Sequence, residues 1–191
     1  MLGLMQHHQL LISSILDHAA RHHGQGEIVS RRDDGALSRT TYAVLARRAR
    51  SLAAVLRTLG VRPGDRVGTM AMNSDRHFEL YYAITGIGAV CNTINPRLAP
   101  DDIAYIVSHA QDGLIFVDPA FFPIVLAIAP KLADVLRGVV VMTDAVSMPR
   151  GAPGVALYCY ESLMEAAGEG EDLPIEDWPV FDENCASNLC Y

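Results

Sequence analysis

The sequence predicts an α/β protein with a mostly parallel sheet flanked by helices, preceded by an N-terminal β-hairpin. From residue 66 onward, short continuous apolar runs alternate with segments whose apolar residues recur at three-to-four spacing. Such runs are typical of strands that are buried on both faces and connected by helices. Upstream, Asp33-Asp34-Gly35 separates two extended stretches, which indicates a hairpin because Gly accepts positive φ. Half of the 191 residues are apolar and 19% are charged, which excludes a disordered chain.

The chain begins with a helical segment over residues 1–26, in which residues 9–23 place their apolar side chains on one side. The hairpin occupies residues 27–40. Thr41 is expected to cap the next helix and Gly60 to end it. Between them, apolar residues recur at helical spacing: Tyr42, Leu45, Ala49, Leu52, Ala53, Leu56 and Leu59.

Residues 41–143 form the predicted alternating α/β core. Its strands are expected over residues 66–72, 90–94, 113–118 and 138–143. Ser74 is expected to cap one intervening helix, and Pro100 to open another. Residues 121–136 read as mostly helical, with Pro123 confined to the first turn and Pro130 dividing the segment. Parallel strands joined in this way require right-handed crossovers.

The last part of the chain is less regular. Residues 144–185 read as a Pro/Gly-rich and then acidic connection, with a short strand and helix over residues 158–167. Residues 186–191 form an expected final strand. A single subdomain, residues 1–191, accounts for all of these segments.

The net charge of −7 comes largely from residues 161–183, which hold nine acidic residues and no Lys or Arg. A solvated loop is the simplest interpretation of that segment. Lys131 is the only lysine, and Arg47, Arg48 and Arg50 read as the polar face of a helix. We therefore expect no nucleic-acid partner.

The cysteines indicate a reducing compartment. Cys91, Cys159, Cys185 and Cys190 show no CxxC pair and no zinc spacing, so we expect buried free thiols. The N-terminus lacks the pattern of a secretory signal, and the apolar stretch 119–130 is too short to span a bilayer. These features predict a cytoplasmic protein without a membrane span.

Motifs for nucleotide binding are weak. A GxxxxGK[ST] phosphate loop is missing from the sequence. The stretch Gly86–Cys91 resembles the start of a dinucleotide fingerprint, but it follows a helix and precedes a strand, the reverse of what pyrophosphate binding needs. A helix-ending glycine pair is the better interpretation.

Histidines are the other candidates for chemistry. His18 and His22 are four residues apart, with His23 beside them, a spacing that can hold zinc. Without a well-placed third ligand, exposed helical histidines are the simpler interpretation, and His7-His8 reads as a flexible end. His77 and His109 lie in helix patterns, as packing or surface residues. Spacing alone therefore assigns no catalytic, cofactor-binding or metal-binding residue.

Several ordered segments together carry a resemblance to a known family. They are Arg39-Thr40-Thr41-Tyr42, Leu59-Gly60-Val61-Arg62-Pro63-Gly64-Asp65-Arg66-Val67, Gly86–Leu98, Tyr105–Ala110, Leu114–Asp118 and the opening Met1–Gln6. In this order they resemble the N-terminal portion of an AMP-forming acyl-CoA synthetase of the adenylate-forming superfamily, closest to the medium- and long-chain fatty-acyl-CoA ligases. The resemblance covers nearly the whole chain.

The resemblance implies ATP, CoA and Mg²⁺ for the parent enzyme, a fatty acid as its substrate, and a possible homodimer. In that family, a Ser/Thr/Gly-rich phosphate loop directly follows a strand similar to 186–191, and neither it nor the later motifs occurs in these residues. Lys131 has the wrong context for the family's catalytic lysine. Val44 stands where many relatives have Glu, which removes a capping-box contact. We expect residues 1–191 alone to be inactive and to bind no cofactor.

Two alternatives remain open from the residues. The same scaffold can act as a non-catalytic dimerisation or assembly module, with Asp33-Asp34-Gly35 as a candidate contact. The chain can also belong to a related enzyme that adenylates aryl or amino acids, because the acyl pocket lies mainly in other sequence. The turn Asn95-Pro96-Arg97, just past a predicted strand, is a candidate substrate contact, although a turn fixed by Pro, with the Arg side chain hydrogen-bonding to backbone, is the simpler interpretation.

Overall fold

The structure, a computed structural model, describes residues 3–32, 35–169 and 177–191. Its centre is a six-stranded sheet in the order β7-β6-β5-β3-β4-β8, and every pairing within it is parallel. The strands are β3 (Arg66–Met70), β4 (Val90–Thr93), β5 (Asp112–Val117), β6 (Gly138–Val141), β7 (Ala156–Cys159) and β8 (Asn188–Leu189). The predicted α/β class with a mostly parallel sheet is confirmed.

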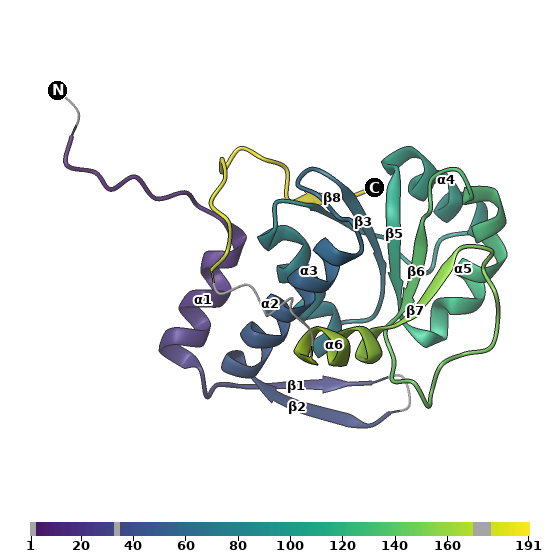
Figure 1. Cartoon of the computed structure of the whole chain (residues 1–191), viewed down its shortest axis with the longest axis horizontal. Coiled ribbons are helices and arrows are strands. Elements are labelled where there is room, and N and C mark those ends of the chain that lie inside the picture. Colours follow the sequence, from purple (N-terminus) through teal and green to yellow (C-terminus); the bar gives the residue numbers. More distant parts are fainter. Residues whose placement is uncertain (1–2, 33–34, 170–176) are drawn as a thin grey trace.

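Helices cover both faces of this sheet (Figure 1). One face carries α1 (Ile12–His23), α2 (Tyr42–Thr58), α3 (Asp75–Gly86) and α6 (Tyr160–Glu169). The other face carries α4 (Pro100–Ala110) and α5 (Phe122–Ile128). Alternate strand residues feed the two cores, so Phe116 packs on the α2 and α3 side and its neighbours Ile115 and Val117 on the α4 and α5 side.

The predicted hairpin is present as β1 (Glu27–Arg31) and β2 (Leu37–Thr41), an antiparallel pair in which Glu27 lies opposite Thr41. Gly35 has φ of 84°, the left-handed conformation that this residue type permits. The adjacent Asp33-Asp34, the proposed assembly contact, lies outside the described residues. The hairpin runs beside the carboxyl ends of the strands, where the hydroxyl of Ser38 donates to Asp75 over 2.6 Å.

The predicted helix boundaries are largely confirmed. The hydroxyl oxygen of Thr41 accepts from the Val44 amide over 3.4 Å, and that of Ser74 accepts from the His77 amide over 3.2 Å. Two prolines divide the segment after β5 into three short helices. These are η1 (Pro119–Phe121), α5 and η2 (Ala129–Leu132), with Pro123 in the first turn of α5 and Pro130 in η2.

The connection predicted over residues 144–185 contributes a strand and a helix to the fold. β7 lies at the sheet edge next to β6, with Gly138 opposite Ala156, and α6 covers α2. The expected final strand is shorter than predicted, because within residues 186–191 only Asn188 and Leu189 form ladder pairs. In the described ranges no helix is long and apolar enough to cross a membrane.

Candidate functional site

The strand order puts β3 at the centre of the sheet, with β4 on one side and β5 on the other. In open α/β sheets, ligands bind beyond the carboxyl ends of the strands. A groove of about 800 Å³ lies there, beyond β3 and β4. We name it the α3 groove, and its lining is Ile28, Val29, Ser30, Thr69, Ala71, Asn73, Ser74, His77, Phe78, Tyr81, Tyr82, Thr93, Ile94, Asn95 and Pro96.

Aromatic side chains from one face of α3 form much of this lining. Phe78 and Tyr82 are one helical turn apart, and their ring centroids are 5.0 Å apart. Tyr81 lies next to them at 6.1 Å from Tyr82. All three rings are only partly buried, so they leave apolar area open to the groove. The arrangement is suited to an apolar or planar ligand group.

His77 is held rigidly in this lining. Its Nε2 lies 3.0 Å from the Thr69 hydroxyl and its Nδ1 lies 3.2 Å from the Met72 carbonyl oxygen. Because a carbonyl only accepts, Nδ1 carries the proton and donates, which leaves Nε2 to accept from Thr69. Burial lowers the pKa of His77, and the Met72 carbonyl only partly opposes this. His77 is therefore a packed and oriented ring in the groove lining, which agrees with the packing or surface role that its helix pattern predicted.

The turn Asn95-Pro96-Arg97 lies just past β4, as predicted, and its first two residues line the α3 groove. The side-chain oxygen of Asn95 accepts from the Arg97 amide over 3.0 Å, so the turn is fixed by its own side chain. Arg97 is exposed.

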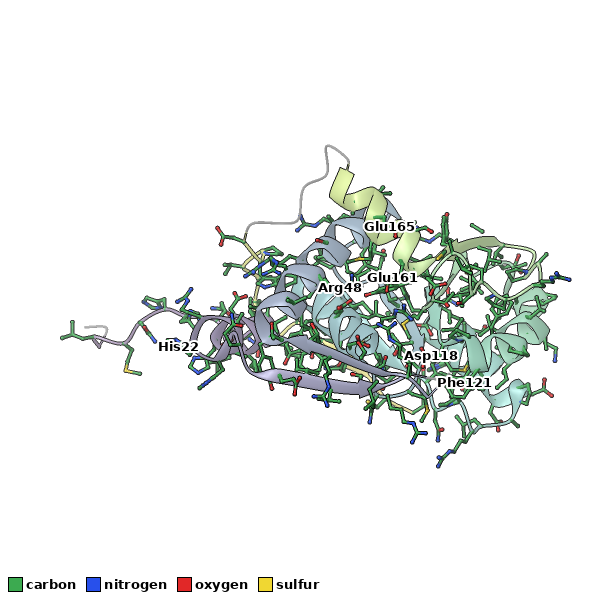
Figure 2. The ribbon with its side chains drawn as sticks, turned by 90° about the horizontal axis from the view of Figure 1, so that it is seen from below. His22, Arg48, Asp118, Phe121, Glu161 and Glu165 are labelled. Carbon is green, nitrogen blue, oxygen red and sulfur yellow. The ribbon has the colours of Figure 1, made fainter. Side chains whose placement is uncertain are left out.

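A second, smaller cavity of about 200 Å³ lies between the carboxyl ends of β3 and β5. Opposite charges line it: Arg31, Arg32, Arg76, Asp75, Asp118 and Asp144. Several of these are already bound, since Asp118 (labelled in Figure 2) accepts from the Met72 amide over 2.7 Å and Arg32 lies 3.5 Å from Asp75. Several of the lining charges therefore already have partners within the protein, which makes this a poorer ligand site than the α3 groove.

A partly buried polar cluster behind the groove joins α2, α3 and α6. Arg48 donates to Glu79 over 2.6 Å and to Glu161 over 3.1 Å, and the Tyr160 hydroxyl donates to Glu79 over 2.7 Å. Figure 2 shows Arg48 and Glu161 side by side. Arg76 also donates to Glu161, over 2.8 Å. Burial, with Glu79 adding to it, raises the pKa of Tyr160. The cluster fixes the helices, and none of its atoms opens into the groove.

The prediction that the arginines of α2 form its polar face is therefore wrong for two of the three. Arg47 is exposed, but Arg48 lies in the cluster. Arg50 donates to Asp17 over 2.6 Å, and its guanidinium lies 5.7 Å from the ring centre of Trp178. Long Arg side chains extend from a polar face to partners at its edge, which periodicity alone does not reveal.

The other residues considered from the sequence lie apart from the groove. Gly88 has φ of 77° after the end of α3, as a helix-ending glycine should. His109 accepts from or donates to the Tyr191 hydroxyl over 2.6 Å on α4. Lys131 is exposed and donates to Asp101 over 2.6 Å. In the part of the chain that is described, no group of three or more His, Cys, Asp or Glu side chains is arranged to hold a metal ion.

The cysteines are free thiols, but only Cys91 is fully buried, and Cys185 and Cys190 are exposed. The expectation of buried thiols is thus wrong for these two, because both follow the acidic segment and lie near the surface edge of β8. Burial raises the pKa of Cys91 to about 12, so its thiol stays protonated and unreactive.

Sequence reasoning did not identify Glu79, Tyr160 or the groove itself. The sequence places Phe78, Tyr81 and Tyr82 in a helix, but their spacing does not show whether these rings line an open groove or pack in a closed core. A usable signal was their position directly after a capped strand-to-helix turn, where carboxyl-end sites form.

Comparisons with known proteins agree on one family. The family described as AMP-binding enzyme matches residues 16–172. The chain is 47% identical over 191 residues to a 3-methylmercaptopropionyl-CoA ligase of Ruegeria lacuscaerulensis, and 42% identical over 191 residues to a medium-chain-fatty-acid–CoA ligase of Ectopseudomonas oleovorans. Each alignment covers 100% of this chain and 34% of the relative, so the chain spans about a third of the length of these relatives.

Solved structures show the same fold. The crystal structure of the anthranilate CoA ligase AuaEII in complex with anthranoyl-AMP matches with a TM-score of 0.79 at 18% identity. The match covers 94% of this chain and 32% of that one. At this identity the likeness concerns the fold alone.

Proposed function

Because the chain belongs to the AMP-binding enzyme family, we propose that the protein is an AMP-forming ligase that joins a fatty acid to CoA. The observation that carries the proposal is the alignment of all 191 residues with two CoA ligases at 42% and 47% identity. A fatty acid is preferred to an aryl acid because the medium-chain-fatty-acid–CoA ligase aligns over 100% of this chain at 42% identity, whereas a trans-cinnamate:CoA ligase aligns over only 42% of it, at 38% identity. The methylthio-substituted propionate named for one relative is the second candidate substrate.

The proposed reaction has two steps. A carboxylate oxygen of the acid attacks the α-phosphorus of ATP, the bond to pyrophosphate breaks, and an acyl-adenylate forms. The sulfur of CoA then attacks the acyl carbon, AMP leaves with the oxygen, and the thiol proton is released to solvent. Both steps depend on groups that stabilise phosphate charge. Mg²⁺ would serve this purpose, but the described residues offer no group of three or more His, Cys, Asp or Glu side chains to hold it.

We further propose that residues 1–191 form one subdomain that acts as the scaffold of this enzyme. β8 runs parallel to β4, with Leu189 opposite Asn92. A phosphate loop following Tyr191 would emerge at the carboxyl edge of the sheet, near the Asn95-Pro96 end of the α3 groove. This placement supports a scaffold role, with the loop supplied by sequence beyond these residues. The same reasoning supports inactivity of residues 1–191 alone, without bound cofactor.

A cytoplasmic location and a homodimer complete the proposal. The four free thiols are what a reducing compartment would preserve. Size-exclusion chromatography with light scattering measures the dimer, and a monomer at every concentration would refute it.

The test is thioester formation by the full-length protein with ATP, CoA and a series of fatty acids, 3-methylmercaptopropionate and aryl acids. We expect AMP and pyrophosphate to form in step with a fatty-acyl thioester. Turnover with release of ADP, or no turnover with any acid, would refute the proposal. ATP–pyrophosphate exchange by the 191-residue chain above background would refute only the proposed inactivity of the scaffold.

A further inference from the structure

The last two turns of α1 carry a group of exposed imidazoles. His18 and His22 are four residues apart, and their ring centroids lie 4.6 Å apart with planes tilted by 42°. His23 is the next residue, and its ring centroid lies 6.1 Å from that of His18. Figure 2 shows His22 on α1, away from the sheet and from Asp118 at its carboxyl edge. The group is therefore separate from the α3 groove.

The protein itself makes little use of these rings. Across residues 3–32, 35–169 and 177–191, no side-chain hydrogen bond or ion pair involves any of the three imidazoles, although the His23 backbone carbonyl accepts from the Gly26 amide. The side of α1 that faces the protein is formed by other residues, chiefly Leu16 and Ser13, which are buried. The nitrogens of His18 and His22 thus stay open to solvent, and a ligand can reach them without moving the core.

The spacing suits one kind of ligand. Side chains at i and i+4 lie one above the other on a helix, so two imidazole nitrogens can approach the same point. Neutral imidazole is a borderline donor that suits Zn²⁺, Ni²⁺ and Cu²⁺. The rings belong to the C-terminal end of the helix, whose partial negative charge favours a cation. Arg21 opposes this weakly from the same turn, while Asp17 is already paired with Arg50.

We propose that His18 and His22 form a two-imidazole surface site for a divalent transition-metal ion, with water completing the coordination. His23 projects to the neighbouring side of the helix and is not a ligand. This site revises the expectation that the chain holds no metal-binding residue, which rested on the lack of a third ligand. It lies far from the proposed ligase chemistry and does not depend on it.

Calorimetric titration of the chain with Ni²⁺ tests the proposal. His22→Asn should weaken Ni²⁺ binding by at least about tenfold. Loss of a residue that only hydrogen-bonds to a metal ligand already weakens metal binding by about this factor, so loss of a ligand should cost no less. His23→Asn is the matched control on the same turn and should bind as the parent does. Because both positions are exposed, the variants should fold normally, which circular dichroism verifies.

Thermal unfolding gives a second readout. Metal that binds only the folded chain raises Tm, so Ni²⁺ should raise the Tm of the parent and of His23→Asn but not of His22→Asn. The variant His7→Asn/His8→Asn shows whether the N-terminal pair binds instead. Three outcomes would overturn the site: unchanged affinity in His22→Asn, an equal loss in His23→Asn, or a loss confined to His7→Asn/His8→Asn.

Discussion

Asp112 should make the free energy of unfolding of this protein fall as the pH rises, the reverse of what a salt-bridged carboxylate does. The side chain is fully buried at the start of β5, where the Asn92 amide donates to one carboxylate oxygen over 2.7 Å. Within the described residues the other oxygen has no hydrogen-bond partner. A Cβ at Gly68 would lie 3.1 Å from the carboxylate, so the glycine makes room for it. Burial raises the pKa of Asp112 to about 7, against weaker opposing effects of Asn92 and Arg66.

The sign follows from the proton balance. Between about pH 4 and pH 7 the unfolded chain carries an ionised carboxylate while the folded chain holds the proton, so folding takes up a proton. The free energy of unfolding must therefore fall as the pH rises through this window. A pKa of about 7 against 3.8 corresponds to about 4 kcal/mol at 1.36 kcal/mol per pH unit.

Urea unfolding at a series of pH values measures this effect, with the fluorescence of the single, nearly buried Trp178 as the signal. Asp112→Asn cannot ionise, so the difference in unfolding free energy between variant and parent should grow by up to about 4 kcal/mol from pH 4 to pH 7.5. His77, whose lowered pKa has the opposite effect, cancels in this difference. Asp101→Asn, at an exposed carboxylate, is the control. A difference that stays constant across this range would refute the reasoning.

Three further predictions follow from burial and contact. Arg48→Met leaves the buried Glu79 without a charge partner and with the Tyr160 hydroxyl as its remaining donor, so urea unfolding should show a loss of about 3–5 kcal/mol, and Arg48→Met/Glu79→Gln should recover part of it. Gly86→Ala places a Cβ against the Trp178 ring and should cost about 1–3 kcal/mol by the same assay. A smaller cost in a Trp178→Phe background would confirm the clash as the cause. Cys91 should resist alkylation of the native chain while the exposed thiols react, and mass spectrometry that finds Cys91 modified first would contradict its burial.

Local physics explains why the fold was predictable. The caps at Thr41 and Ser74, the left-handed Gly60 and the prolines around α5 each act within one turn of chain, so the residue type alone indicates the structure. Burial of the strands on both faces likewise appears as continuous apolar runs.

Interactions over long sequence separations could not be read in this way. Arg48 reaches Glu79 across 31 residues and Glu161 across 113 residues, and each looks like an ordinary surface charge in its own helix. The strand predicted over residues 113–118 left out Asp112, because an acid at the start of β5 interrupts the apolar pattern that indicates a buried strand. The α3 groove depends on how β1, β4 and α3 converge, which only the sheet order determines.

The short β8 has a consequence for the order of folding. β8 pairs with β4 through only two residues, and roughly half the chain lies between the two strands. Because loop-closure entropy grows with loop length, forming this pair costs more entropy than forming any crossover within the core. Trp178 assists by fixing the returning segment, since its indole donates to Asp17 over 3.2 Å beside Arg50. β8 should therefore join last and open first in native-state hydrogen exchange, which leaves the strand nearest the proposed phosphate loop as the least protected part of the sheet.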